Sequence, residues 1–318
     1  MTTIHMESTS EDLRVHTDAK RLRSLGNEAR KVSLLPSRQP ANSVLNGRHA
    51  SRLRGRGLNF EELRDYINGD DVRTIDWKVT ARTGKPHVRV YTEERDRPAL
   101  LLVDQRTSMF FGSQVYMKSV IAAEAAAIAA HRILDQGDRI GGIVFGDDRI
   151  AEHRPVRSRT ALRKLLTSIA DANSLLNAER EQETEISINT VLKSALRIAK
   201  TNGLVLVFSD FDTIDSDTER LVRSLSASND LIFFNVADPF SEQLPSDLKL
   251  TVSDGVLQAE LDLADTNVKR RLEEVSSGRL ADIFKWSAKY GFPVFPLTTT
   301  EPALIQILRL LGHLGARH

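Results

Sequence analysis

The stretch Pro98-Ala99-Leu100-Leu101-Leu102-Val103-Asp104-Gln105-Arg106-Thr107-Ser108-Met109 decides the fold of this chain. Its first half is a continuous apolar run, which is typical of a strand that is covered on both faces. Its second half begins with a carboxylate and is mostly polar. We therefore expect a buried strand that carries polar, functional side chains at its carboxyl end.

Downstream of this stretch, apolar strand-like runs alternate with amphipathic or Ala-rich helical segments. Strands are expected at 140–145, 204–208, 231–236 and 294–297, with a hairpin at the sheet edge over 248–261. Helices are expected at 115–134, 160–170, 190–200, 217–227, 267–290 and 302–314. This alternation predicts an α/β fold with a doubly wound, mostly parallel sheet and helices on both faces. We assign residues 98–318 to this domain.

Upstream of residue 98 the sequence has a different character. Residues 41–97 are rich in Arg, Gly and Asp and have few apolar residues with which to build a core. We expect a loop-rich segment that is held by polar contacts and anchored by Phe60, Leu63, Tyr66 and Trp77. Residues 1–40 are polar, so we expect either a weakly ordered leader or one amphipathic helix from Glu11 to Lys31.

The composition excludes several classes of function. The 318 residues contain no cysteine, which excludes disulfides, thiol catalysis and Cys-ligated metals. The longest apolar run, Val120 to Ala130, is interrupted by Glu124 and is about half as long as a membrane-spanning helix. The N-terminal residues do not resemble a signal peptide. We therefore expect a cytoplasmic protein without direct membrane insertion.

The net charge of +1 hides an asymmetry along the chain. Residues 1–97 hold 19 basic and 14 acidic residues, a net charge of +5, whereas residues 98–318 hold 25 and 29, a net charge of −4. Of the 44 basic residues 32 are Arg, whose guanidinium is suited to bidentate contacts with carboxylates. Since acids and arginines share the same segment, internal ion pairing is favoured over nucleic-acid binding.

Polar side chains gather at the carboxyl ends of the predicted strands, where doubly wound sheets bind their ligands. Asp104 and Ser108 follow the first strand, Asp210 follows the third, and Thr190 opens the helix that leads into the third. Two carboxylates and two hydroxyls suit a hard cation such as Mg²⁺. The architecture and these loops resemble a von Willebrand factor A domain with its metal-ion-dependent adhesion site. The resemblance implies that these four residues are the metal ligands.

Arg106 departs from that pattern, because it stands where the Asp-x-Ser-x-Ser loop of the adhesion site has its first serine. A guanidinium about 4 Å from a divalent ion would cost roughly 8 kcal/mol at an effective dielectric constant near 20. An inward-pointing Arg106 would replace the ion by pairing with Asp104 and Asp210, whereas an outward-pointing one would leave a weakened Mg²⁺ site. In either case the site is degenerate, and the arginine itself becomes a candidate to bind a carboxylate of a partner.

A second resemblance rests on the Arg/Gly/Asp-rich segment. Its blocks are Arg54-Gly55-Arg56-Gly57-Leu58-Asn59-Phe60, Gly69-Asp70-Asp71-Val72-Arg73-Thr74-Ile75-Asp76-Trp77, Thr80-Ala81-Arg82 and Glu93-Glu94-Arg95, with Ala237-Asp238-Pro239 further on. They are similar to the signature of the bacterial domain-of-unknown-function fifty-eight family over roughly residues 40–300. The resemblance implies a partner of a MoxR-type AAA+ ATPase that acts with it on a client protein.

The charged residues of that segment have two interpretations. The set consists of Arg64, Asp70, Asp71, Arg73, Asp76, Trp77 and Arg82. One interpretation is a scaffold of charge-assisted hydrogen bonds, or a partner-binding surface. The other is a metal-dependent hydrolase or phosphoryl-transfer enzyme that uses the three carboxylates. Because arginines surround the acids and no phosphate loop or nucleophile elbow is present, we expect a non-enzymatic adaptor without catalytic residues.

Overall fold

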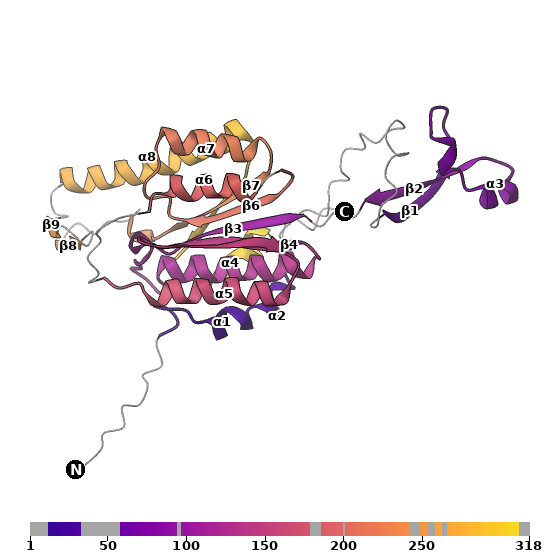
Figure 1. The fold of residues 1–318 in the computed structure, drawn as a ribbon. Helices are drawn as coiled ribbons and strands as arrows, with labels where there is room; N and C mark the ends of the chain where they lie inside the picture. The colour runs from indigo at the N-terminus through magenta and orange to yellow at the C-terminus, as the bar shows by residue number, and fades with distance from the viewer. Residues whose placement is uncertain are drawn as a thin grey trace, which may run out of the picture. The chain divides into compact units, whose positions relative to one another are not determined.

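A six-stranded sheet forms the centre of the larger of two structural units (Figure 1). The computed structural model describes residues 12–32, 58–93, 97–178, 186–199, 201–241, 249–253, 258–262 and 266–311. The larger unit combines residues 1–34 with residues 97–318, and the smaller unit is residues 35–96.

The sheet is mostly parallel, as the sequence predicted. Its strands are β3 (Pro98–Asp104), β4 (Arg139–Phe145), β5 (Ile150–Val156), β6 (Leu204–Ser209), β7 (Asp230–Ala237) and β10 (Val294–Thr298). The strands lie in the order β10-β7-β6-β3-β4-β5, and only the edge strand β5 is antiparallel to its neighbour among these six. Counted along the chain and read from β5, this is the order 3-2-1-4-5-6 of doubly wound folds.

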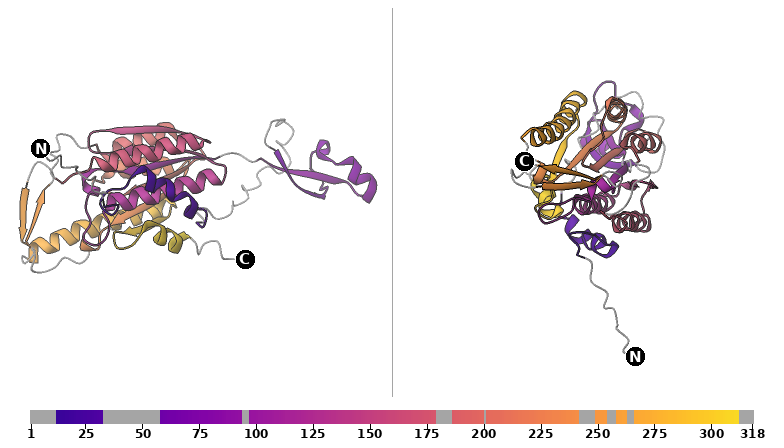
Figure 2. Two further views of the ribbon diagram at one scale, coloured as in Figure 1. Left: turned by 90° about the horizontal axis from the view of Figure 1, so that it is seen from below. Right: turned by 90° about the vertical axis from the view of Figure 1, so that its left-hand side faces the viewer.

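Helices cover both faces of this sheet (Figure 2, right). One face carries α6 (Ile188–Ile198), α7 (Ser216–Ser226) and α8 (Thr266–Tyr290), and the other carries α4 (Lys118–Asp135), α5 (Arg159–Ser174) and α9 (Ala303–Leu311). The α/β architecture implied by the von Willebrand factor A resemblance is therefore confirmed.

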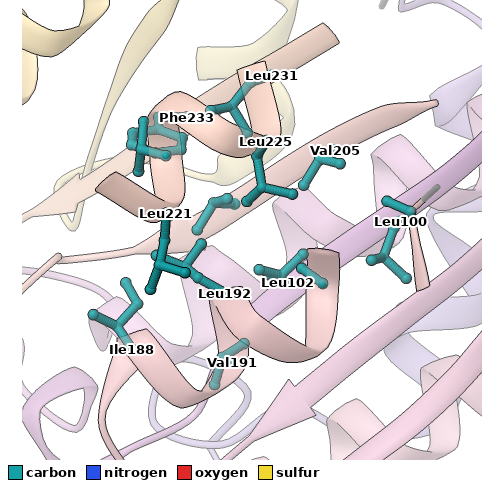
Figure 3. Close-up of a cluster of buried hydrophobic side chains, with 14 of the residues drawn as sticks. Leu100, Leu102, Ile188, Val191, Leu192, Val205, Leu221, Leu225, Leu231 and Phe233 are labelled. Atoms are coloured by element: carbon teal, nitrogen blue, oxygen red, sulfur yellow. The ribbon is translucent and has the colours of Figure 1, made fainter. Parts of the chain in front are cut away.

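Strand β3 lies in the middle of the sheet, between β6 and β4, and both of its faces are buried. Leu100 and Leu102 point into a cluster that includes Val191 and Leu192 of α6 and Leu225 of α7 (Figure 3). Successive side chains of a strand point to opposite faces, so Leu101 and Val103 face the α4 side. On that side the alanines of α4 are fully buried, and their small side chains allow the helix to pack closely on the sheet.

Two features of this unit differ from the sequence prediction. The sequence did not predict β5, whose alternating exposure, arginine and proline are typical of an edge strand. The predicted hairpin is present as β8 (Lys249–Ser253) and β9 (Gln258–Asp262), but these strands form a separate two-stranded sheet rather than an edge of the six-stranded one.

The described part of the N-terminal segment, residues 12–32, is folded onto the α/β domain. It forms α1 (Ala19–Ser24) and α2 (Gly26–Ala29), which pack against α4 and α5, instead of the single helix considered from the sequence. Leu22 and Leu25 are completely buried, and Arg21 donates to the buried Glu124 of α4 at 2.7 Å. Burial of these leucines explains why a mostly polar segment is attached to the domain.

The smaller unit has more regular structure than its loop-rich composition predicts. Strands β1 (Leu58–Asp65) and β2 (His87–Glu93) pair antiparallel, and they flank the short helix η2 (Val72–Thr74) and α3 (Trp77–Thr83). Gly84 ends α3 in the left-handed conformation, with φ of 74°. Across both units, none of the described helices combines the length and the apolar character required to cross a bilayer.

Candidate functional site

At the carboxyl end of β3, Arg106 points inward and pairs with Asp104. Its Nε donates to Oδ1 at 3.0 Å and its Nη2 donates to Oδ2 at 2.8 Å. The backbone N–H of Arg106 also donates to Oδ1, and Ser209 Oγ donates to Oδ2 at 2.6 Å. Both side chains of the pair are 0% exposed. Both oxygens of the Asp104 carboxylate therefore already accept hydrogen bonds from donors of the same chain.

The local environment of Arg106 explains how a buried guanidinium is accommodated. Its Nη1 donates to Thr213 Oγ1 at 3.2 Å, and its Cζ lies 5.6 Å from the centre of the Phe145 ring. Burial raises the pKa of the Asp104 carboxyl, and the charge of Arg106 opposes that rise. Because Arg106 is fully buried, it is positioned as a scaffold residue and not as a surface that a partner's carboxylate could reach.

A second ion pair lies at the same edge. Lys118, the first residue of α4, donates from Nζ to Asp210 Oδ2 at 2.6 Å, and both side chains are nearly buried. Burial alone would raise the pKa of Asp210, but the charges of Lys118, Arg106 and Arg279 hold it below its ordinary value. The second predicted metal ligand is thus also neutralised by a cation of the chain.

The remaining two predicted ligands are not drawn into this cluster. The hydroxyl of Ser108 is buried and has no hydrogen-bond partner among the described residues, a feature that would suit a metal ligand. Thr190 is exposed on α6, and in the described part of the chain its side chain has no hydrogen bond to the other three residues.

Taken together, the residues at this edge do not fit Mg²⁺ as they are folded. A divalent ion needs free oxygen ligands at about 2.1 Å, whereas Asp104 and Asp210 already accept hydrogen bonds from Arg106 and Lys118. An ion would also have to enter beside two positive charges. The single free hydroxyl of Ser108 does not offset that repulsion.

Two residues of the site were missed by sequence reasoning. Asp147 is buried after β4 and accepts from the N–H of Thr107 at 3.0 Å and from its Oγ1 at 2.7 Å, which fixes the loop after Arg106. Its position at the carboxyl end of a predicted strand was the signal that could have identified it. Nothing in the sequence marked Lys118 as a site residue, because it lies within the predicted helix 115–134 and does not follow a strand.

The loop between β3 and α4 displays apolar side chains at this edge. Phe111 and Val115 are each 43% exposed, and the ring of Phe111 lies 6.0 Å from that of Phe240. The buried Asp238 holds the loop, because its carboxylate accepts from the N–H and the Oγ of Ser113, at 2.8 and 2.5 Å. The signature stretch Ala237-Asp238-Pro239 therefore has a structural role here.

In the smaller unit, the three acidic residues have separate tasks. Asp70 accepts two bonds from Arg64, at 2.7 and 2.8 Å, which lower the pKa of Asp70. Asp71 accepts from the backbone N–H of Arg73 and caps η2. Asp76 caps α3 through the N–H groups of Lys78 and Val79.

The predicted charge network is consequently corrected in its connections. The ion-pair partner of Asp76 is Arg89, at 2.7 Å, an arginine outside the predicted set. Arg73 and Arg82 are exposed and make no salt bridge with the residues that the structure describes. Trp77 is 67% exposed, so it is not a buried anchor of this unit. The arrangement consists of two pairs and two helix caps, and it does not bring the three carboxylates together on one ion.

Most of the chain is similar to one protein family. The model of the family described as "Protein of unknown function DUF58" matches residues 62–279. "Uncharacterized protein Rv1480" of Mycobacterium tuberculosis and "Uncharacterized protein Mb1516" of Mycobacterium bovis are each 26% identical over 280 residues, which is 87% of this chain and 86% of each relative.

Two solved structures are similar at low sequence identity. An aerotolerance-related membrane protein of Bacteroides fragilis is 12% identical, with a TM-score of 0.41 over 68% of this chain and 97% of its own. A von Willebrand factor type A protein of Catenulispora acidiphila is 13% identical, with a TM-score of 0.30 over 60% of this chain and 44% of its own.

Proposed function

The chain belongs to the DUF58 family, and from that premise we propose that it is a non-enzymatic adaptor that links a MoxR-type AAA+ ATPase to a client protein during maturation or assembly of a complex. One observation carries the proposal. The carboxylates at the ligand-binding edge of the sheet are neutralised by Arg106 and Lys118 of the same chain. They are therefore not free to hold a reactive ion or to act as acids and bases.

The same edge offers a partner an apolar surface. Phe111 and Val115 are exposed on a loop whose backbone N–H groups donate to the Asp238 carboxylate and to the carbonyl of Thr299. Burial of apolar surface contributes about 25 cal/mol per Å² to association, from which the entropic costs of binding are subtracted. Aromatic side chains on a rigid support are frequent hot spots of protein interfaces. We therefore assign the ATPase contact to Phe111 and Val115 and expect it to be independent of a metal. The cytoplasm, where ATP is available, is the proposed location.

A binding experiment with purified proteins tests this function. The chain is mixed with the MoxR-type ATPase of the same organism, and the complex is measured by pull-down in nucleotide-free buffer with EDTA or Mg²⁺. We expect equal binding in both buffers and a loss of at least about tenfold in affinity for F111S/V115S. The matched control is F284S/V156S, because Phe284 and Val156 are similarly exposed, at 47% and 44%.

Three outcomes would contradict the proposal. The first is that no complex forms with the ATPase, and the second is that EDTA abolishes binding and Mg²⁺ restores it. The third is turnover of a phosphomonoester or phosphodiester by the chain alone with Mg²⁺ or Mn²⁺, which would favour a hydrolase that uses Asp70, Asp71 and Asp76. Unchanged binding by F111S/V115S would place the contact elsewhere on the chain.

A further inference from the structure

A shallow groove of about 520 Å³ lies beside the edge strand β5, away from the site described above. Its lining residues are His153, Thr160, Arg163, Lys164, Thr167 and Ser168. His153 belongs to β5, and the other five residues lie on α5. Helix α5 lies on the face of the sheet opposite α6 and α7 (Figure 1). No residue of the groove belongs to the Asp104 and Asp210 cluster.

The groove is lined by part of a basic stretch of the sequence. Between Glu152 and Asp171 the sequence has no acidic residue, and it has five basic residues. Arg163 and Lys164 are exposed and form no salt bridge with any described residue, unlike the cations of the sheet edge. The exposed Arg154 and Arg159 extend this positive surface on either side in sequence. Because the whole chain is nearly neutral, this concentration of unpaired charge is local.

Hydroxyl groups complete the lining. Thr160, Thr167 and Ser168 provide hydrogen-bond donors beside the two cations, and Ser168 Oγ is bonded to His153 Nε2 at 2.9 Å. Burial and the charge of Lys164 lower the pKa of His153, so the imidazole is neutral at neutral pH. The positive charge of the groove therefore comes from Arg163 and Lys164.

The spacing of these side chains favours an elongated ligand. Thr160, Arg163 with Lys164, and Thr167 with Ser168 lie on successive turns along one face of α5. At 1.5 Å per residue, this row is roughly 12 Å long. An extended peptide rises about 3.3 Å per residue, so the row matches about four residues of an extended chain.

We propose that this groove binds an extended acidic segment of a partner protein, with carboxylates on Arg163 and Lys164. Nucleic acid is less favoured, because single strands are bound through aromatic stacking and residues 149–178 contain no Phe, Tyr or Trp. A second alternative is that the charge only prevents aggregation through the edge strand. That role requires charge on β5 itself, however, whereas the cations of the groove lie on α5.

The test is a fluorescence anisotropy titration of the full chain. The probe is a labelled peptide of about ten residues in which Glu and Thr alternate, compared with the same peptide carrying Gln in place of Glu. We expect only the acidic peptide to bind, and its affinity to fall as salt is added. R163E/K164E should weaken it by roughly tenfold or more, which corresponds to about 1.4 kcal/mol. The matched control is K193E/R223E, because Lys193 and Arg223 are exposed helix cations on the opposite face.

Circular dichroism of both variants checks that each remains folded. The proposal is overturned if the acidic peptide does not bind, if both double variants weaken it equally, or if the Gln peptide binds as tightly. A single-stranded oligonucleotide of the same charge that binds more tightly than the peptide, with the same loss in R163E/K164E, would assign the groove to nucleic acid instead.

Discussion

Arg106 and Asp104 form a bidentate ion pair at 3.0 and 2.8 Å with no exposure of either side chain; Asp104 is the last residue of the central strand β3, and Arg106 lies two residues later in the loop. An ion pair of this kind is difficult to exchange for a metal, because removal of either partner leaves an unpaired buried charge. Substitutions that remove one charge of this pair should therefore lower the free energy of unfolding more than substitutions that remove both.

Removal of the guanidinium should destabilise the fold. R106A leaves the Asp104 carboxylate buried without its counter-charge, and we expect a loss of about 3–5 kcal/mol in the free energy of unfolding. Urea denaturation measures this loss. D104L/R106M removes both charges and should recover most of it, since an apolar pair of similar size needs no compensation. Equal destabilisation by the double variant would contradict the account.

The natural chain should not respond to Mg²⁺. We expect the Tm to be the same in EDTA and in millimolar Mg²⁺, and S108A to be neutral or stabilising, because the buried hydroxyl of Ser108 has no partner among the described residues. R106S/K118A removes both cations and places a serine at position 106, so its Tm should rise with Mg²⁺ concentration. A Mg²⁺-dependent Tm in the natural chain would show that the internal pairs are displaced by the ion.

Lys118 should stabilise the fold in a pH-dependent way. The pKa of Asp210 is held below its ordinary value of 3.8, so the pair contributes fully above about pH 4 and is lost as pH falls through the lowered pKa. K118M raises that pKa. The variant should be about 3 kcal/mol less stable at pH 7, and its deficit should shrink as pH approaches about 4. Urea denaturation at several pH values checks this, and a constant deficit would contradict it.

Asp76 should act mainly as a helix cap. If the charged set acted as an interlocked scaffold, removal of Asp76 would cost a few kcal/mol by leaving arginines unpaired. In the structure its partner Arg89 is 47% exposed, so water can hydrate the freed guanidinium. We expect D76A to cost about 1–2 kcal/mol and D76N clearly less, because Asn also caps helices. Hydrogen exchange of the amides of residues 77–83 measures the effect locally, and equal effects of the two variants would favour the charge over the cap.

Gly141 should not tolerate a side chain. A Cβ atom there would lie 2.4 Å from the carbonyl oxygen of His153 and 2.6 Å from the nitrogen of Pro155, which are backbone atoms that cannot rotate away. G141A should therefore destabilise the fold by about 1–3 kcal/mol through strain against β5. G278A is the control, because nothing lies within 4 Å of its Cβ position in α8, and it should stabilise by roughly 0.5–1 kcal/mol. Thermal denaturation compares the two.

Parts of the fold were accessible from the sequence because they depend on local pattern. The apolar run of residues 99–103 is typical of a strand buried on both faces, and the alternation after it indicated a doubly wound sheet. β5 was missed because an edge strand contacts the sheet on one side only and carries Arg154 and Pro155, which read as a loop. The packing of residues 12–32 was missed because it depends on a few leucines meeting α4, a contact between distant segments.

The sequence by itself determined which residue types follow the strands of the sheet: Asp104, Ser108 and Asp210, whose oxygens suited a metal, and Arg106, whose charge opposed one. Only the tertiary structure decided that Arg106 points inward and that Lys118, from the next helix, pairs with Asp210. The physical reason is that the local sequence does not fix the direction of an arginine side chain, which can extend toward water or toward a carboxylate. Arg106 is held inward by Asp104, Thr213 and Phe145, and Ser209 bonds the same carboxylate of Asp104. These residues come together only when separate strands and loops meet at one edge.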